Sequence, residues 1–157
     1  MEVEHVLDSL AVLPHVLPAR VLDIGSGAGL PGIPLAIARP SWHVTLLDSN
    51  HKRCTFMQQA VIELDLRNVE VACERAESYR PTKAFDTAVS RAFSDTAHFA
   101  RVALPLVAPA GVMLAMKGLY PHEELAQLPP QVVLEDVVPL SIPGLDAQRH
   151  LLVMTKA

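Results

Sequence analysis

Short apolar runs alternate with amphipathic segments along most of the chain. Apolar runs of five or six residues are typical of buried strands, and the amphipathic segments between them favour helices. The pattern predicts strands over residues 20–24, 43–48, 68–73, 85–90 and 112–116. It predicts helices over residues 1–17, 31–39, 49–66 and 95–107 and around Glu123, with a turn at 108–111.

Residues 132–140 and 150–155 are rich in β-formers and stand apart from this alternation, so we expect them to form an antiparallel pair. Alternating strands and helices favour an α/β fold, an open, mostly parallel sheet with helices on both faces. Ligands of such sheets bind beyond the carboxyl ends of the strands. Without a repeat or a linker, residues 1–157 are expected to form a single domain.

The helix over residues 49–66 has two predicted features. Ser49 follows a strand directly and is a residue type that caps helix N-termini. Phe56, Ala60 and Leu64 fall on one face of this helix. Asp95 is expected to open the next helix in the same way as Ser49.

The strongest motif is the glycine-rich run DIGSGAGLPG at residues 23–32, which joins a predicted strand to a predicted helix. In that context a glycine loop indicates a nucleotide-like ligand, either a dinucleotide or S-adenosylmethionine. Asp48 ends the next strand, where a carboxylate can hold the ribose diol of either ligand. Asp23 distinguishes between these two ligands. Its carboxylate would repel the pyrophosphate of a dinucleotide, whereas it would attract the sulfonium and the ammonium group of S-adenosylmethionine. The loop therefore favours S-adenosylmethionine.

Cationic residues follow several of the predicted strands. The segments Arg75-Ala76-Glu77, Ser90-Arg91-Ala92-Phe93 and Lys117-Gly118 each come directly after an apolar run. Either these side chains form surface salt bridges, or they face the ligand crevice and the acceptor of a transferred group. Arg75, Arg91, Lys117 and Arg149 are expected to share a positive rim at the strand ends, with the acidic residues elsewhere.

Composition limits the classes of function. The 13 Lys and Arg against 17 Asp and Glu give a formal charge of −4, which excludes strong non-specific binding to nucleic acid. Any contact with RNA must therefore be made by a local cationic patch. A hydrophobic content of 50% excludes intrinsic disorder. Two distant cysteines and scattered histidines predict no metal site. The absence of a signal peptide or a spanning run predicts a cytoplasmic protein with no membrane partner.

The chain carries several motifs that occur together in one known family. They are DIGSGAGLPGIP at 23–34, LLDS with Lys52, Arg53 and Phe56, SRAF at 90–93, Lys117-Gly118 and RHL at 149–151. In these motifs the chain resembles the RsmG (GidB) family. Its members are bacterial 16S ribosomal RNA guanine-N7 methyltransferases. The resemblance covers essentially the whole chain. It implies the Rossmann-like, seven-stranded class I methyltransferase sheet with an antiparallel last strand, and S-adenosylmethionine as cofactor. It also implies an N-terminal helical segment before the motif at 5–9, of which residues 1–18 would be the remnant.

By motif position, the resemblance implies a function for particular residues. The reaction would be in-line displacement of the methyl group by guanine N7, which needs no general base, so Arg91 and Lys117 are candidates for positioning only. The partner would be 16S ribosomal RNA or the small ribosomal subunit. Candidates for the RNA side are Arg75, Lys117, Arg149 and His150. Cofactor contacts are implied for Gly25, Leu30, Asp48, Ala76, Glu77 and Arg91, and the glycine loop adds Ser26, Gly27 and Gly29.

Three other functions stay open on the sequence. The same fold could methylate a small molecule or a protein, because a fold does not determine the acceptor. The chain could be a truncated module that binds the cofactor without turnover. A dinucleotide-dependent oxidoreductase is the third. The oligomeric state is not predicted.

Overall fold

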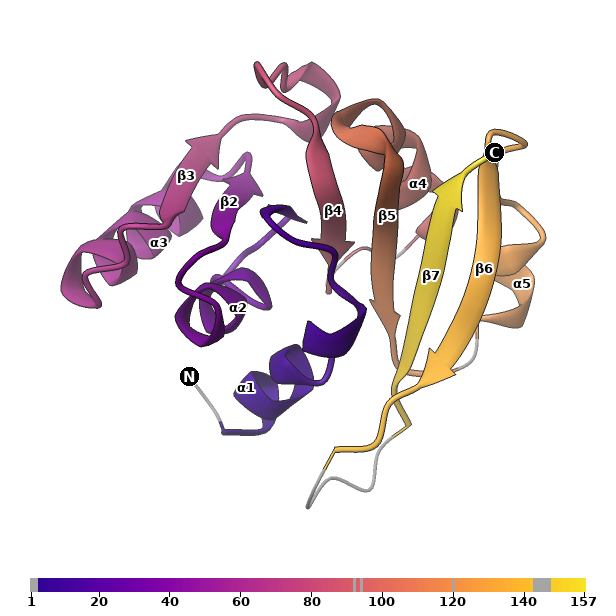
Figure 1. Cartoon of the computed structure of the whole chain (residues 1–157), viewed down its shortest axis with the longest axis horizontal. Coiled ribbons are helices and arrows are strands. Elements are labelled where there is room, and N and C mark those ends of the chain that lie inside the picture. Colours follow the sequence, from indigo (N-terminus) through magenta and orange to yellow (C-terminus); the bar gives the residue numbers. More distant parts are fainter. Residues whose placement is uncertain (1–2, 92, 94, 120, 143–147) are drawn as a thin grey trace.

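Seven strands form one mixed sheet in the computed structural model, which describes residues 3–91, 93, 95–119, 121–142 and 148–157 (Figure 1). The strand order is β3-β2-β1-β4-β5-β7-β6. Pairs from β3 to β5 are parallel, and β7 runs antiparallel to both of its neighbours. The strands are β1 (Arg20–Ile24), β2 (His43–Asp48), β3 (Val69–Cys73), β4 (Phe85–Ser90), β5 (Val107–Lys117), β6 (Val132–Pro139) and β7 (His150–Lys156).

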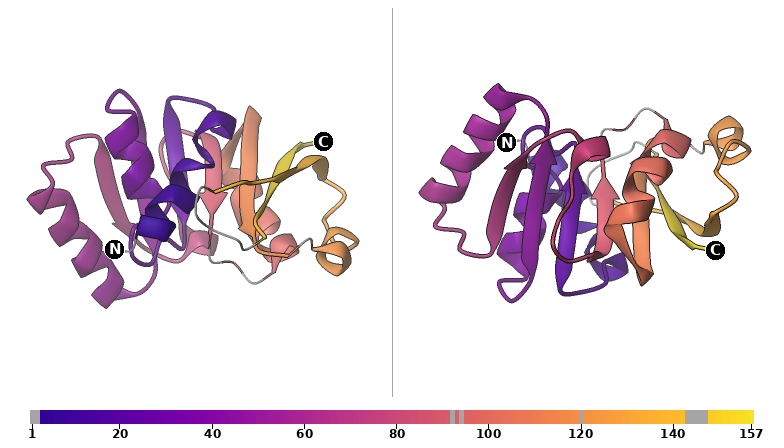
Figure 2. Two further views of the ribbon diagram at one scale, coloured as in Figure 1. Left: turned by 90° about the horizontal axis from the view of Figure 1, so that it is seen from below. Right: turned by 90° about the horizontal axis from the view of Figure 1, so that it is seen from above.

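Helices cover both faces of this sheet (Figure 2). They are α1 (Val3–Leu10), α2 (Gly32–Ala38), α3 (His51–Glu63), α4 (Thr96–Ala103) and α5 (His122–Leu125), with short 3-10 turns at Leu13–His15, Ala76–Ser78 and Leu104–Leu106. Successive strand residues point to opposite faces and divide the core into two clusters. Val21 packs with residues of α2 and α3, whereas Leu22 packs with residues of α4. The predicted α/β fold and its antiparallel last strand are confirmed.

The helix predicted over 1–17 is shorter than expected and is followed by a separate turn. Residues 1 and 2 lie outside the described residues, α1 ends at Leu10, and Pro14 lies in the 3-10 turn that follows. This segment is well packed: α1 contacts α2, and Val12 is completely buried. The Thr87 hydroxyl bonds both the N–H and the carbonyl of Leu17, each at 2.9 Å. Residues 3–18 therefore cover the sheet and contribute to its core.

The predicted N-cap of α3 is wrong. The N-cap is Asn50, whose side chain accepts a hydrogen bond from the Arg53 N–H at 3.0 Å, and not Ser49. The buried face is formed by Cys54, Met57 and Val61. Phe56 and Leu64 are instead 56% and 52% exposed. The face that carries Phe56, Ala60 and Leu64 therefore lies mainly away from the core, although Ala60 is partly buried against it.

The turn predicted at 108–111 lies inside β5. Phe85 pairs with Val107 but Thr87 pairs with Val112, so β5 carries extra residues at this point and bulges out of register. A Cβ on Gly111 would lie 2.8 Å from the Asp86 carbonyl oxygen, so this glycine lets the two strands approach. Asp95 caps α4 as predicted, with its carboxylate accepting the Ala97 N–H at 3.0 Å.

No helix among the described residues has the length and the apolar composition that crossing a membrane requires.

Candidate active site

The loop between β1 and α2 has three glycines in the left-handed region of backbone space. Gly25, Gly27 and Gly29 have φ of +70°, +60° and +88°, values that other residues rarely adopt. A Cβ on Gly27 would meet nothing nearer than 4.0 Å, so the loop leaves open space there. A Cβ on Gly29 would lie 2.4 Å from the Ile33 side chain. Gly29 therefore serves the packing of the loop on its own helix and Gly27 faces open space, whereas a Cβ on Gly25 would contact the Phe93 ring at 3.6 Å.

Asp23 forms hydrogen bonds with both ends of this loop. Its carboxylate accepts the Gly32 N–H at 2.8 Å, and its carbonyl accepts the Ser26 hydroxyl at 2.9 Å. The side chain is completely buried and lines none of the pockets described below. The expectation that its charge would face the ligand is wrong, since the residue ties the two ends of the loop together instead.

Asp23 should make the stability of the protein depend on pH. Burial raises its pKa from an ordinary value of 3.8 to about 8. Between these values the folded chain keeps a proton that the unfolded chain has released, so the free energy of unfolding should fall as pH rises from about 4 to about 8. Asp23→Asn should remove much of that fall, as measured by urea unfolding across this range. Asp65→Asn, at an exposed carboxylate, is the control; an unchanged slope in Asp23→Asn would contradict the assignment.

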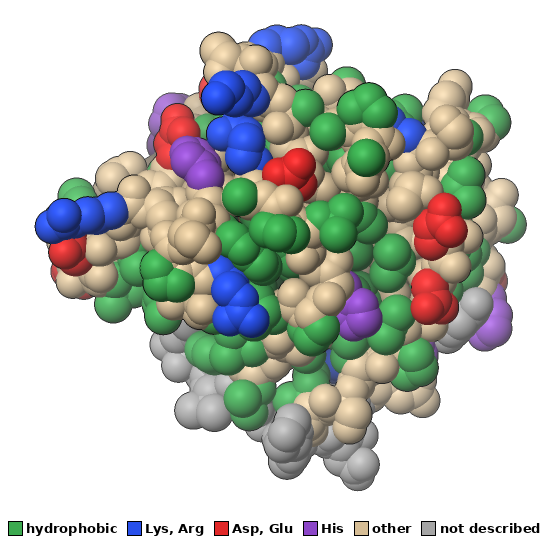
Figure 3. Space-filling view, viewed as in Figure 1, with side chains coloured by type: hydrophobic (Ala, Val, Ile, Leu, Met, Phe, Trp, Pro, Cys, Tyr) green, Lys and Arg blue, Asp and Glu red, His purple; other side chains and the backbone are tan. Residues whose placement is uncertain are grey.

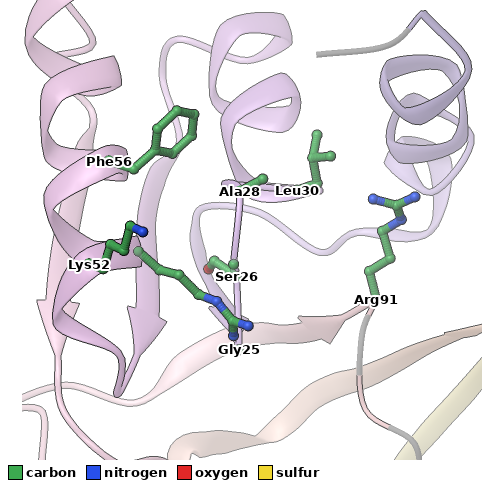
Figure 4. A pocket seen from close by; sticks show the side chains of 9 residues that line it. Gly25, Ser26, Ala28, Leu30, Lys52, Phe56 and Arg91 are labelled. Atoms are coloured by element: carbon green, nitrogen blue, oxygen red, sulfur yellow. The ribbon is translucent and has the colours of Figure 1, made fainter.

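A pocket of about 750 Å³ opens over the glycine loop (Figure 4). In Figure 4 Lys52 and Phe56 of α3 lie on one side of the loop, and Arg91 lies on the other. An adjoining pocket of about 300 Å³ shares Gly25 and Arg53 with the first and extends along the ends of β2 and β3. The first pocket is lined by Gly25, Ser26, Gly27, Ala28, Leu30, Lys52, Arg53, Phe56 and Arg91.

The two pockets bring together most of the predicted cofactor residues. Gly25, Ser26, Gly27, Leu30 and Arg91 line the first pocket. The second is lined by Asp48, Ala76 and Glu77, together with Arg75, one of the residues predicted for the RNA side. Gly29 lines neither pocket. The parallel strands explain this result, because their carboxyl ends meet at one edge of the sheet.

Asp48 is held at this edge by the backbone of both flanking loops. Its Oδ2 accepts the Gly27 N–H at 3.0 Å, and its Oδ1 accepts the Asn50 N–H at 2.9 Å. Arg53 Nη1 lies 3.9 Å from Oδ2. The side chain is nearly buried, and each carboxylate oxygen retains a further lone pair. Asp48 can therefore accept a hydrogen bond from a ligand hydroxyl while it fixes the loop.

Sequence reasoning gave no site role to Lys52, Arg53 and Phe56, although all three line the first pocket. A helix that begins directly after the strand carrying Asp48 must place its first turns at the same edge of the sheet. That signal could have identified these residues.

Lys117 is less accessible than predicted. Its side chain is 11% exposed, and its Nζ donates to the Phe93 carbonyl and to Glu124 Oε1, both at 2.9 Å. Burial tends to raise the pKa of Glu124, but hydrogen bonds from Lys117 and from the Thr96 N–H outweigh it and hold that pKa below its ordinary value. Lys117 thus connects the end of β5 to the segment after β4 and to α5.

Arg149 and Arg91 converge on one buried carboxylate from α1. Arg149 Nε donates to Asp8 Oδ2 at 3.1 Å, and Arg91 Nε lies 4.0 Å from the same oxygen. His150 Nδ1 is 2.8 Å from the Gly118 carbonyl oxygen. Of the SRAF motif, Ala92 lies outside the described residues.

The expectation of a positive rim with the acidic residues elsewhere is therefore wrong. Asp8 and Glu124 lie directly among the cations that were assigned to it. On the face shown in Figure 3, Lys and Arg side chains lie in separate small groups, several of them next to Asp or Glu. Within the part of the chain that the structure describes, no three His, Cys, Asp or Glu side chains form a candidate metal site.

Comparison with known proteins gives consistent matches along the chain. The profile of the family described as "GidB: rRNA small subunit methyltransferase G" matches residues 1–152. A "Ribosomal RNA small subunit methyltransferase G" of Laribacter hongkongensis (strain HLHK9) is 58% identical over 94% of this chain and 71% of its own length. The protein of the same name from Nitrosospira multiformis (strain ATCC 25196 / NCIMB 11849 / C 71) is 56% identical, over 98% and 74%.

The fold also matches solved structures. A SAM-dependent methyltransferase from Aquifex aeolicus superposes with a TM-score of 0.78, covering 98% of this chain and 93% of its own. Its sequence is 17% identical, so the likeness concerns the fold alone.

Proposed function

Because the chain belongs to the GidB family of rRNA small subunit methyltransferases G, we propose that it transfers a methyl group from S-adenosylmethionine to N7 of a guanine in 16S ribosomal RNA. The observation that carries the proposal is the family match over residues 1–152, which includes every motif that lines the two pockets. The chain is a methyltransferase that uses S-adenosylmethionine and acts on ribosomal RNA. The choice of guanine N7 is the finer part of the proposal.

The residues of the site fit this cofactor. The open cradle at Gly27 accepts a ligand against the backbone, and the retained lone pairs of Asp48 suit a ribose diol. Ala76 and Glu77 follow β3 in the second pocket, where we place the adenine. Arg91, across the first pocket, suits the carboxylate of the methionine part. When bound, the cofactor supplies a methyl group activated by the adjacent sulfonium.

The role of the chain in the transfer is mainly to position the reactants. Guanine N7 carries an in-plane lone pair and no proton, so no side chain has to act as a general base before the attack. Positioning alone can supply a large rate effect, because it converts a bimolecular step into one within a complex. Positive charge develops on the base, so a guanidinium directly against N7 would oppose the reaction. We therefore place Arg91 near a carboxylate or guanine O6 and not at N7.

Arg91→Ala should lower the rate of methyl transfer by about 10- to 100-fold while the protein stays folded, because one charge-assisted contact is lost. Arg91 is 27% exposed and lies 4.0 Å from its carboxylate partner, so its removal should cost little stability. Transfer of labelled methyl to 16S RNA and the urea midpoint measure the two effects. Arg101→Ala, on the exposed side of α4, is the matched control. Unchanged turnover in Arg91→Ala would remove this residue from the site.

The proposal is tested with labelled S-adenosylmethionine, the purified chain and either deproteinised 16S RNA or small ribosomal subunits. Label should enter RNA, and borohydride–aniline cleavage should locate it at 7-methylguanosine. Label in an RNA-free extract, with none in RNA, would support a small-molecule or protein substrate instead. Binding of S-adenosylhomocysteine with no transfer to any of these would favour a binding module.

A further inference from the structure

A smaller cavity, of about 190 Å³, lies beside the cofactor pocket and is separated from it by Arg91, which lines both. It occurs where β4 and β5 end and β7 begins. We call this cavity the Asp8 pocket. Its lining residues are Asp8, Arg91, Met116, Lys117, Gly118 and Arg149. A group bound there would lie next to the methyl donor.

Only one of the two Asp8 carboxylate oxygens has a hydrogen-bond partner. Its side chain is 4% exposed, and Oδ2 accepts the hydrogen bond from Arg149. Oδ1 is buried and has no hydrogen-bond partner. A buried carboxylate oxygen without a donor is costly, and such atoms commonly mark a place for a ligand or water. The carboxylate therefore retains acceptor capacity for N–H groups that enter the pocket.

A purely structural role would use this carboxylate differently. Arginine and carboxylate groups that serve as cross-links commonly pair through two parallel hydrogen bonds. Here Arg149 engages only one oxygen, through Nε, and Arg91 stays 4.0 Å away. Both arginines are more than a quarter exposed, so their side chains can adjust when a ligand enters.

We propose that the Asp8 pocket binds the Watson–Crick edge of the target guanine, with Asp8 accepting its N1–H and N2–H groups. The proposal deepens the function proposed above and rests on it. Guanine presents two adjacent donors on that edge, which a carboxylate matches, whereas adenine presents an acceptor at N1. An arginine beside Asp8 can donate to O6, as arginine does in guanine recognition. This arrangement leaves N7 without a protein donor, as its lone pair requires for attack.

Nucleotide binding to the chain of residues 1–157 tests the proposal, with S-adenosylhomocysteine saturating the proposed cofactor pocket. The probes are guanosine, inosine and adenosine monophosphates, and the readout is the methyl NMR signal of Met116, a buried wall of the pocket. The signal is assigned by its loss in Met116→Leu. Guanosine monophosphate should shift it, and inosine monophosphate, which lacks the 2-amino group, should bind about tenfold more weakly. Equal affinities for the three nucleotides, or no response at Met116, would overturn the proposal.

Asp8→Asn separates recognition from structure. The amide oxygen should stay on Arg149, which places the NH2 group where Oδ1 was and turns it toward the donors of guanine. The preference for guanosine over adenosine monophosphate should then fall by at least tenfold, an effect that the mere loss of an α1 contact would not produce. Glu123→Gln, at an exposed carboxylate outside the pocket, should keep the wild-type preference. A retained guanine preference in folded Asp8→Asn would refute the role of Asp8.

Two further comparisons keep the results unambiguous. If Asp8→Asn does not bind S-adenosylhomocysteine, it is misfolded and gives no result on recognition. The comparison of guanosine with inosine monophosphate on the wild-type chain then tests whether the pocket recognises the 2-amino group of guanine. Methyl transfer to RNA without a guanine preference at Met116 would reject the Asp8 pocket but not the proposed function. A guanine preference without transfer to RNA would reject the proposed function but not the Asp8 pocket.

Discussion

Asp48→Ala is expected to weaken the binding of S-adenosylhomocysteine by about 1.5–3 kcal/mol, roughly 10- to 150-fold in Kd. The carboxylate has two functions that alanine removes together. It can bond a ligand hydroxyl, and it holds the N–H groups of Gly27 and Asn50, which would lose their acceptor. Because the glycine loop is held by this carboxylate, its loss should disturb the cradle as well as the direct contact.

Isothermal calorimetry with S-adenosylhomocysteine measures this effect directly. Glu63→Ala is the control, since Glu63 is an exposed carboxylate on α3 at the far end from the pocket. It should bind with the wild-type Kd. If Asp48→Ala also binds with the wild-type Kd, then Asp48 holds no part of the cofactor and the position of the ribose must be reassigned.

Lys117→Met is expected to have the largest effect on stability, about 2–3 kcal/mol of the free energy of unfolding. Removing one partner of a buried ion pair costs about 3–5 kcal/mol, and the 29% exposure of the Glu124 side chain reduces that figure. The Phe93 carbonyl would also lose its donor. The segment after β4 carries Arg91, so methyl transfer should fall together with stability.

The double variant Lys117→Met/Glu124→Gln distinguishes an ion pair from simple packing. Without the carboxylate, no unpaired charge remains beside the apolar methionine, so the double variant should recover more than half of the lost stability in urea unfolding. If the two substitutions are instead additive, Lys117 does not stabilise the fold through Glu124.

Much of the candidate site was predictable from the sequence because it depends on local chemistry. The glycine loop needs backbone angles that favour glycine, and Asp48 ends an apolar run whose length is typical of a buried strand. Parallel pairing then brings the ends of β1 to β4 to one edge. The order of the strands left two positions open for Ala76, Glu77 and Arg91, the surface or the ligand crevice, and the resemblance to the RsmG (GidB) family favoured the crevice, where all three line a pocket.

Side-chain partners were less predictable, because they depend on how distant segments pack. Phe56 is an apolar residue of a predicted helix, yet it lines the pocket and is 56% exposed, because α3 packs on the core through Cys54, Met57 and Val61. Lys117 was expected at an exposed rim, yet α5 folds back and places Glu124 against it. The number of charges along the chain cannot predict such pairs. Salt screens the attraction between distant charges, so a pair forms only where the fold places the two side chains close together.

The sequence by itself determined the sheet and the edge at which the pockets open, since these follow from periodicity and from a loop whose conformation requires glycine. The class of cofactor followed from the resemblance of the motifs to those of the RsmG (GidB) family. Only the tertiary structure decided which charges remain available to a substrate. Asp8 and Arg149 are 141 residues apart along the chain, and their contact exists only because α1 packs beside the start of β7. No periodicity or spacing marks Asp8, because its significance depends on burial, and burial is a property of the whole fold.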